Sequence, residues 1–195
     1  MNQGSIHINV REDEEALYFL TNWIPEYKES LIRYADNPNI AKYLACRFPS
    51  PYTEEDALWY LNYAQTTEDE RLMAIVRQDK STGVIEAIGS IGFSFYKGER
   101  EHSGEFGYWL GEKFWGKKLM TAVAKTFLDE CIEPYRHQHK PVTLSKLTAV
   151  VYTPNTGSVR VLEKNGFEIE AKLKRYAWKD GQYYDAYILS RFYDD

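Results

Sequence analysis

Gly116, Lys117 and Lys118 form a short glycine–lysine cluster that could hold an anion. They lie between a strand-like stretch and a helix-like stretch. The first N–H groups of a helix have no internal partner, and the helix dipole favours negative charge there. Gly116 lets a ligand approach the main chain closely, and the two lysines add positive charge. This pattern predicts an anion-binding site, although a tight turn with two solvated lysines explains a lone Gly-Lys-Lys equally well.

A second strand-to-helix junction downstream favours the functional interpretation. Residues 147–152 are rich in β-branched side chains, which is typical of a strand. Asn155 is a good N-cap for the short helix that follows, whose apolar face includes Val159 and Leu162. Gly166 suits a left-handed stop at the end of that helix.

The hydrophobic pattern predicts the strand and the helix on either side of the glycine–lysine cluster. Residues 105–110 are aromatic and apolar between Gly104 and Gly111, which predicts a buried strand. After Gly116 the apolar positions recur at helical spacing, which predicts an amphipathic helix through Cys131. Its apolar face would contain Leu119, Met120, Val123, Ala124, Phe127 and Leu128.

The remaining elements are predicted from the same patterns and from turn signals. Strands are expected at 6–10, 16–20, 71–77, 87–96, 167–178 and 183–189, and helices at 27–35, at 39–45 and after Thr53. Thr53 and Asp56 have the spacing of a capping box. Asp180-Gly181 is a strong signal for a type I′ hairpin turn. The sequence has no internal repeat or linker, so one domain is expected over residues 1–195.

Together, the motifs resemble the GCN5-related N-acetyltransferase (GNAT) superfamily. In that family Asn-x-x-Ser/Ala and then Gly-Phe follow the pyrophosphate-binding helix, and the matching residues here are Asn155, Ser158 and Gly166-Phe167. The likeness is strongest to the branch of ribosomal-protein N-terminal acetyltransferases and their small-molecule relatives. It covers nearly the whole chain, because residues 36–44 and 48–57 look like the N-terminal half of that branch. No single motif is specific, but three in the right order are fairly specific.

The resemblance implies the GNAT fold, an α/β (α+β) architecture with a central, mostly antiparallel, splayed mixed sheet of about seven strands flanked by helices. It also implies an acetyl-CoA-dependent N-acetyltransferase that acts on a primary amine, either a protein N-terminus or a small-molecule amine. The pantetheine arm of acetyl-CoA would enter between the strands ending near Leu110 and Tyr152, and would pair with the first like an added strand. The implied cofactor-binding residues are Tyr108, Trp109, Leu110, Trp115, Gly116, Lys117, Lys118, Leu119, Met120, Asn155 and Ser158.

The same resemblance suggests catalytic residues. The attacking amine must lose a proton, and Glu105 matches a strand glutamate that often serves the family as base, directly or through waters. Desolvation beside aromatic residues could raise the pKa of such a carboxyl group. A purely structural carboxylate is the alternative role for Glu105, and Glu170 is the other candidate base. Where the wider family often has a tyrosine as general acid, this chain has Leu162. Ser158 matches the suspected substitute, although it could equally bond only to local backbone.

One further departure from the family lies in the pyrophosphate loop. Lys118 replaces a second small residue. Its side chain would crowd the phosphates if it pointed inward, and would help to bind them if it pointed outward. Lys118 and Leu162 keep open a second function, a catalytically degenerate GNAT-fold module that binds acyl-CoA or a protein partner. Aromatic residues that could shape the acceptor cleft are Trp59, Tyr63, Trp178 and Tyr184.

Composition bounds the remaining possibilities. The 195 residues are 44% hydrophobic and 27% charged, as in ordinary globular proteins. The net charge of −5 argues against a nucleic-acid binder. No apolar segment approaches the length of a membrane span and the N-terminus has no secretory pattern, so the cytoplasm is the expected location, with the nucleus as an alternative. Either a monomer or a homodimer is compatible with the sequence.

The cysteines and histidines give no metal signal. Cys46 and Cys131 are far apart in the sequence, and both are expected to be small buried apolar residues without a disulfide or metal role. His137 and His139 form a His-x-His pair with no evident third ligand, so a solvated loop is favoured over a metal site.

Overall fold

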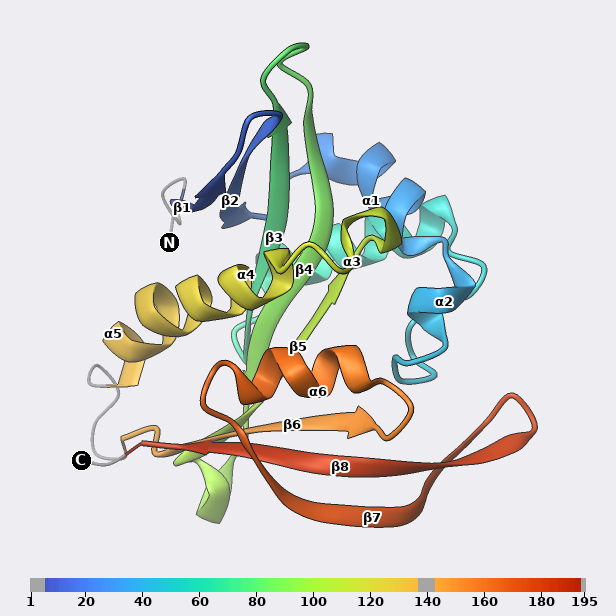
Figure 1. Ribbon diagram of the computed structural model, residues 1–195, viewed down its shortest axis with the longest axis vertical. Helices are drawn as coiled ribbons and strands as arrows, with labels where there is room; N and C mark the ends of the chain where they lie inside the picture. Colours follow the sequence, from blue (N-terminus) through green and yellow to red (C-terminus); the bar gives the residue numbers. More distant parts are fainter. Residues whose placement is uncertain (1–5, 137–142, 194–195) are drawn as a thin grey trace.

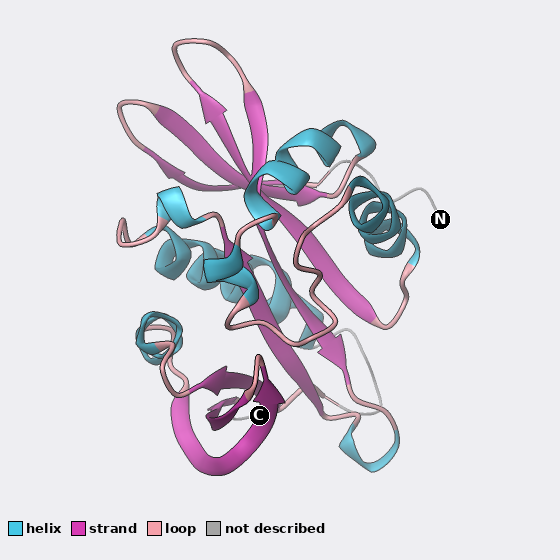
Figure 2. Cartoon of the chain, turned by 90° about the vertical axis from the view of Figure 1, so that its right-hand side faces the viewer, coloured by secondary structure: helices cyan, strands magenta, loops and turns pink. Residues whose placement is uncertain are grey.

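The computed structural model describes residues 6–136 and 143–193. Within them the chain forms one eight-stranded sheet with helices on both faces (Figures 1 and 2). The predicted mixed α/β class is confirmed, with eight strands in the described residues rather than about seven. Across the sheet the strands are β1 (His7–Glu12), β2 (Ala16–Asn22), β3 (Glu70–Asp79), β4 (Ile85–Phe95), β5 (Ser103–Leu110), β6 (Lys146–Tyr152), β8 (Gln182–Phe192) and β7 (Glu168–Lys179).

Every neighbouring pair in this sheet is antiparallel except β5 and β6, which are parallel. In Figure 1, β3 and β4 run nearly vertically whereas β6, β8 and β7 run nearly horizontally. The sheet therefore changes direction sharply where β5 meets β6. The helices are α1 (Lys28–Ala35), α2 (Pro38–Ala41), α3 (Glu54–Thr66), α4 (Leu119–Phe127), α5 (Glu133–Arg136) and α6 (Thr156–Glu163).

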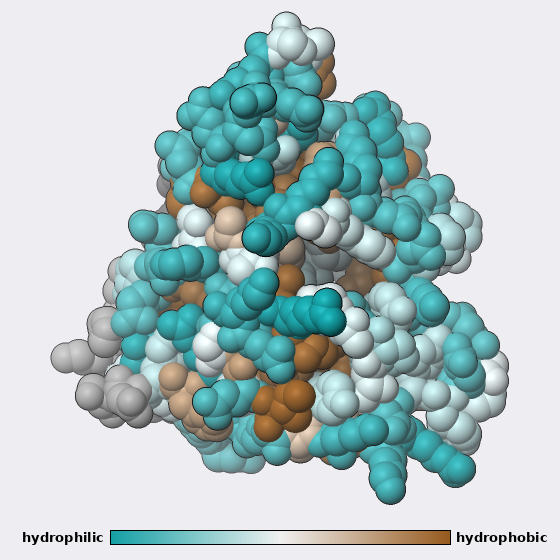
Figure 3. Space-filling model, viewed as in Figure 1, coloured by the Kyte–Doolittle hydropathy of each residue, from teal (hydrophilic) through white to brown (hydrophobic). Residues whose placement is uncertain are grey.

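The two faces of the sheet have separate hydrophobic cores. Helices α4 and α6 contribute to one core, in which Phe127 packs against the aromatic ring of Phe106. Helices α1 and α3 contribute to the other, where Leu31 is buried. Successive side chains of a strand point to opposite faces of the sheet, so Leu20 of β2 packs in the first core and Phe19 in the second. On the face shown in Figure 3 most of the surface is hydrophilic, and hydrophobic residues gather near its middle.

Three locally encoded features confirm the sequence predictions. The capping box at α3 is complete, with the Thr53 side chain accepting from Asp56 and the Asp56 carboxylate accepting from Thr53. Helix α6 ends at Glu163 and the chain leaves it through Gly166, whose φ is +79°, and the Phe167 N–H bonds back to the Leu162 carbonyl at 3.1 Å. Positive φ at both residues of the β7–β8 turn is what a type I′ turn requires.

Two predicted helix boundaries are wrong. The helix expected at 39–45 is α2, which is capped by Asn37, begins at Pro38 and ends at Ala41. The helix that starts at Leu119 does not stop near Cys131, because it continues through a wider π turn into α5. Pro134 directly follows this π turn, as the second residue of α5.

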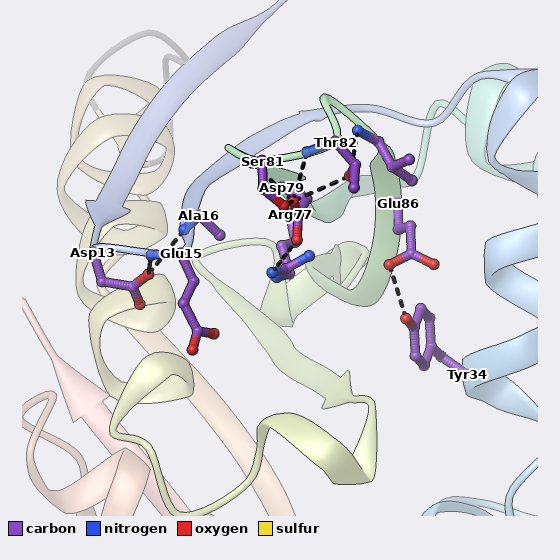
Figure 4. Close-up of polar contacts among 10 residues, drawn as sticks. Asp13, Glu15, Ala16, Tyr34, Arg77, Asp79, Ser81, Thr82 and Glu86 are labelled. Atoms are coloured by element: carbon purple, nitrogen blue, oxygen red, sulfur yellow. Dashed lines mark hydrogen bonds and ion pairs between the residues drawn. The ribbon is translucent and has the colours of Figure 1, made fainter.

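The β3–β4 hairpin is closed by a compact polar turn, drawn in Figure 4. The Asp79 carboxylate accepts hydrogen bonds from Ser81, Thr82 and Arg77. These donors, the Ser81 hydroxyl first among them, hold the pKa of Asp79 well below its usual range. Farther along β4, the Glu86 carboxylate accepts from the Tyr34 hydroxyl at 3.0 Å and so ties α1 to the sheet.

Both cysteines are free, but only Cys131 is partly buried, and the prediction that Cys46 is buried is wrong. The predicted His137 and His139 pair lies outside the described residues. In residues 6–136 and 143–193, every helix is too short or too polar to span a lipid bilayer.

Candidate active site

The sheet opens between β5 and β6. Their pairing stops after three positions, the last of which is Glu105–Thr148. Beyond this point β5 remains paired with β4 as far as Leu110, and β6 with β8 as far as Tyr152. The two strands therefore diverge, and a cavity of about 790 Å³ is lined by residues from both. This divergence is the splay expected from the sequence.

The register of β5 decides which main-chain groups face the gap. The Gly111 N–H donates to the Ile88 carbonyl at 2.8 Å, and hydrogen-bonded positions alternate along an antiparallel pair. Counting back in steps of two, the main chain of Trp109 faces β4, while that of Tyr108 and Leu110 faces the gap. The expected main-chain pairing at Trp109 is therefore unsupported, and its side chain lines the cavity instead.

Two long side chains anchor the loop between β5 and α4. The Trp115 indole N–H donates to the Leu110 carbonyl at 2.7 Å, which ties the loop to the end of β5. Arg11, from β1, donates to the Lys117 carbonyl at 2.9 Å. Arg11 is distant in the sequence, and nothing in the local pattern around it indicates this contact.

The loop presents free N–H groups at the start of α4. The first hydrogen bond of the helix runs from the Ala122 N–H to the Lys118 carbonyl at 3.3 Å. Over the described part of the chain, the N–H groups of residues 116–121 have no backbone acceptor. A run of such donors at a helix N-terminus is suited to a phosphate group.

The loop conformation explains why small residues suit it. Gly116 and Lys118 have φ values of +73° and +59°. Glycine adopts this region freely, whereas a lysine there costs about 1 kcal/mol. The Lys118 side chain is exposed. Leu119 and Met120, the next predicted cofactor residues, are buried and can meet a ligand only through their main chain.

The start of α6 faces β5 across the gap. Asn155 caps the helix, its side-chain oxygen accepting from the Ser158 N–H at 3.2 Å. The Ser158 hydroxyl lies 2.9 Å from the Tyr108 hydroxyl, which also donates to the Ser158 carbonyl at 3.2 Å. Burial raises the pKa of the Tyr108 phenol, and the hydrogen bond to Ser158 offsets this only in part. Leu162 is fully buried and lines the same cavity.

The two candidate bases have different surroundings. Glu105 lines the cavity and is exposed rather than desolvated, with the Tyr96 hydroxyl donating to it at a long 3.4 Å. Glu170 lies outside the lining of that cavity and forms an ion pair of 2.8 Å with Lys146. The hydrogen bond from Lys146, with a second from Ser190, lowers the pKa of Glu170. A carboxylate held in this way is a poor proton acceptor, so the geometry favours Glu105.

The aromatic residues expected around the acceptor divide between two cavities. Trp59 and Tyr63 of α3 stack with ring centroids 5.1 Å apart and line the cavity of the gap. Trp178 and Tyr184 line a separate cavity of about 740 Å³ beside α2. Residues that the sequence did not single out also line the first cavity: Tyr43, Arg47, Tyr52, Tyr60, Glu70 and Tyr176.

Across the described residues, no group of three or more His, Cys, Asp or Glu side chains could hold a metal ion. The candidate site thus consists of a cavity lined by an open strand edge, a carboxylate and two hydroxyl groups, together with the loop after β5 that presents free N–H groups.

Comparison with known families identifies the class of protein. Residues 18–168 match the model of the acetyltransferase (GNAT) domain family. The chain therefore belongs to this family of acetyltransferases, and acetyl-CoA is its co-substrate.

Individual relatives agree with this assignment. An uncharacterized N-acetyltransferase, p20, of Bacillus licheniformis is 24% identical over 169 residues, which is 85% of this chain and 86% of the relative. The ribosomal-protein-S5-alanine acetyltransferase of Vibrio fischeri superimposes with a TM-score of 0.71 at 19% identity, over 96% of this chain and 98% of the other. The microcin C7 self-immunity acetyltransferase MccE, solved with acetyl-CoA and AMP, gives 0.70 at 19% identity, over 93% and 94%. At these identities the two structures show a shared fold.

Proposed function

We propose that this chain moves the acetyl group of acetyl-CoA to a primary amine, which attacks the thioester directly. The observation that carries this proposal is the early end of the β5–β6 pairing, beside the free N–H groups of residues 116–121. A diphosphate needs an anion site, and a pantetheine arm can pair with an open strand edge. Here the open edge of β5 lines the cavity, and the loop that follows β5 presents the free N–H groups.

In this arrangement the diphosphate lies on the N–H groups of residues 116–121, and the loop lysines offset its charge. The pantetheine arm pairs with the main chain of Tyr108 and Leu110. Asn155 and Ser158 flank the arm from α6. Trp115 contributes by holding the loop against the end of β5.

The chemistry requires a neutral amine, because an ammonium group has no lone pair with which to attack. Glu105 accepts the proton directly or through a water molecule. The new N–C bond forms as the C–S bond breaks, and CoA leaves as the thiolate. Glu105 is exposed, so it can pass the proton on to solvent.

The proposed acceptor is a protein N-terminus or a small-molecule amine. Glu70 lines the cavity as well as Glu105, which suits a positively charged amine as it approaches. The stacked rings of Trp59 and Tyr63 offer a flat face to an apolar group or a cation.

Release of free CoA thiol from acetyl-CoA tests the proposal. The acceptor panel contains an unblocked peptide, the same peptide with an acetylated N-terminus, a polyamine, an amino acid and an aromatic amine. We expect thiol release with at least one free amine, none with the blocked peptide, and a product heavier by one acetyl group. Binding of acetyl-CoA without release for any amine would contradict transfer and indicate a non-catalytic acyl-CoA-binding module.

The proposed location is the cytoplasm. Exposed Cys46 and half-buried Cys131 are both free thiols, which suits a reducing compartment better than an oxidising one. Cell fractionation tests this, and recovery of the protein with a secreted or membrane fraction would contradict it.

A further inference from the structure

The hydroxyl pair in the gap has a role beyond packing. Tyr108 belongs to β5 and Ser158 to the first turn of α6, so their contact of 2.9 Å spans the opening between the two elements. Both residues line the cavity, as does Leu162, which has no proton to give. Both hydroxyl groups can therefore donate a hydrogen bond within the cavity, whereas Leu162 cannot.

A count of protons shows what the pair can do. Each hydroxyl has one proton, and the Ser158 carbonyl can only accept. If Tyr108 donates to that carbonyl, Ser158 can donate to Tyr108, and neither proton is left for a ligand. If Tyr108 donates instead to the Ser158 hydroxyl, the Ser158 proton is free to point into the cavity. A negative charge in the gap favours the second arrangement.

We propose that Tyr108 holds the Ser158 hydroxyl as a hydrogen-bond donor to the sulfur of the thioester, which makes Tyr108 a positioning residue for departure of the thiolate. This inference rests on the proposed binding of acetyl-CoA in the gap. As the C–S bond breaks, its electron pair moves to sulfur, which accepts the hydrogen bond from Ser158. Neither hydroxyl gives up its proton: the amine proton goes to Glu105, and the thiolate is protonated by solvent.

The environment of Tyr108 agrees with donation without proton transfer. Burial raises the pKa of its phenol, so the hydroxyl stays protonated through the neutral and mildly basic range. The Ser158 hydroxyl keeps its proton and still stabilises a neighbouring thiolate by hydrogen bonding. This lowers the pKa of the thiol from which that thiolate forms.

The pKa of the thiol of bound CoA therefore tests the inference without any acceptor. It is followed by the ultraviolet absorbance of the thiolate while the complex is titrated with base. We expect the bound thiol to have a lower pKa than free CoA. We expect Tyr108→Phe to raise it by about half a unit or more, and Ser158→Ala to raise it further. The double variant should match Ser158→Ala alone, because Tyr108 acts through Ser158.

The control is Tyr27→Phe, which removes the hydroxyl of another buried tyrosine whose side chain lies outside the cavity lining. It should leave the pKa of bound CoA unchanged. The inference is overturned if Tyr108→Phe leaves that pKa unchanged, if the two substitutions act additively, or if CoA does not bind. Ser158→Ala alone decides the question if Tyr108→Phe does not fold, since an unchanged pKa in that variant excludes the donor.

Turnover gives a second, separate measurement. Tyr108→Phe should lower kcat about three- to tenfold, the range for loss of one hydrogen bond, with the acetyl-CoA dissociation constant within about twofold of the parent value. The expected thiol pKa values without acetyl transfer would support the donor pair and contradict the proposed function. Acetyl transfer by a protein that leaves the thiol pKa of bound CoA unchanged would support the proposed function and contradict the donor pair.

Discussion

Two neighbouring strand pairs in this sheet are built in opposite ways. Strands β3 and β4 are paired from Glu70–Ser94 to Gln78–Ile85, and Asp79 closes their turn with several hydrogen bonds. Strands β5 and β6 are paired at three positions and then separate. The first pair satisfies its own main chain, whereas the second leaves main-chain groups facing a cavity.

The difference shows where the fold keeps room for a ligand. Buried polar groups of the main chain need partners, so an open edge inside a sheet is costly unless water or a ligand fills it. Both sides of the gap are held in place by strand pairing, because β5 stays paired with β4 and β6 with β8. The gap is therefore a fixed feature of the packed sheet rather than a frayed end.

Removing the carboxylate at the gap should have the largest effect. We expect Glu105→Gln to slow acetyl transfer at least tenfold, because the amide cannot accept the amine proton. Binding of acetyl-CoA, measured by calorimetry, should stay nearly intact. Glu99→Gln, a neutralised glutamate in the loop before β5, is the matched control. Equal rates for Glu105→Gln and the parent would remove Glu105 from its proposed role.

Gly92 of β4 and Gly107 of β5 are paired, but the space available to an added side chain differs between them. A Cβ on Gly92 would lie 2.4 Å from the Arg71 carbonyl oxygen, whereas one on Gly107 would have no atom within 4 Å. Gly107→Val should therefore fold and narrow the cavity, raising the KM for the amine about tenfold. Gly92→Val should instead lower the thermal midpoint. Unchanged kinetics in a folded Gly107→Val protein would mean that the acceptor binds elsewhere.

The closed hairpin should respond to pH rather than to ligand. Hydrogen bonds lower the pKa of Asp79 in the folded state. Its contribution to stability is therefore complete above its unfolded pKa of about 3.9 and is lost as the pH falls through the folded value. We expect Asp79→Asn to be less stable than the parent at neutral pH, and the difference to shrink below about pH 4. Denaturant unfolding at several pH values measures this, and a difference independent of pH would exclude the carboxylate as its source.

The smallest expected effect is in the loop between β5 and α4. Lys118→Gly removes both the positive charge and the backbone strain, so we expect about 1 kcal/mol more stability and acetyl-CoA binding weakened about two- to fivefold. Lys118→Ala removes the charge but keeps the strain, so it should show only the weaker binding. Tighter binding by both variants would instead mean that the lysine side chain obstructs the phosphates.

The sequence predicted those parts of the molecule that are encoded within a few residues. The Thr53 capping box, the Asn155 cap and the Asp180-Gly181 turn depend on neighbours along the chain, so their patterns were sufficient. The resemblance to a family predicted the splay, which is confirmed. It also favoured a phosphate site in the loop before α4, which local patterns left open and which stays a prediction.

The features that the sequence missed depend on tertiary packing. The contact of Arg11 with the Lys117 carbonyl joins β1 to a loop more than a hundred residues away. The pairing of Tyr108 with Ser158 depends on how far β5 and β6 diverge, which no local pattern encodes. Register likewise decided that the main chain of Trp109 faces β4, since a shift of one residue would reverse every assignment on the strand.

Amide hydrogen exchange with and without acetyl-CoA measures whether the main-chain groups of the gap bind the co-substrate, because it reports on these groups one by one. We predict slower exchange on addition of acetyl-CoA at Tyr108 and at residues 116–121, and no change along residues 71–78 of β3. Unchanged exchange at Tyr108 and residues 116–121 with saturating acetyl-CoA would contradict binding in the gap.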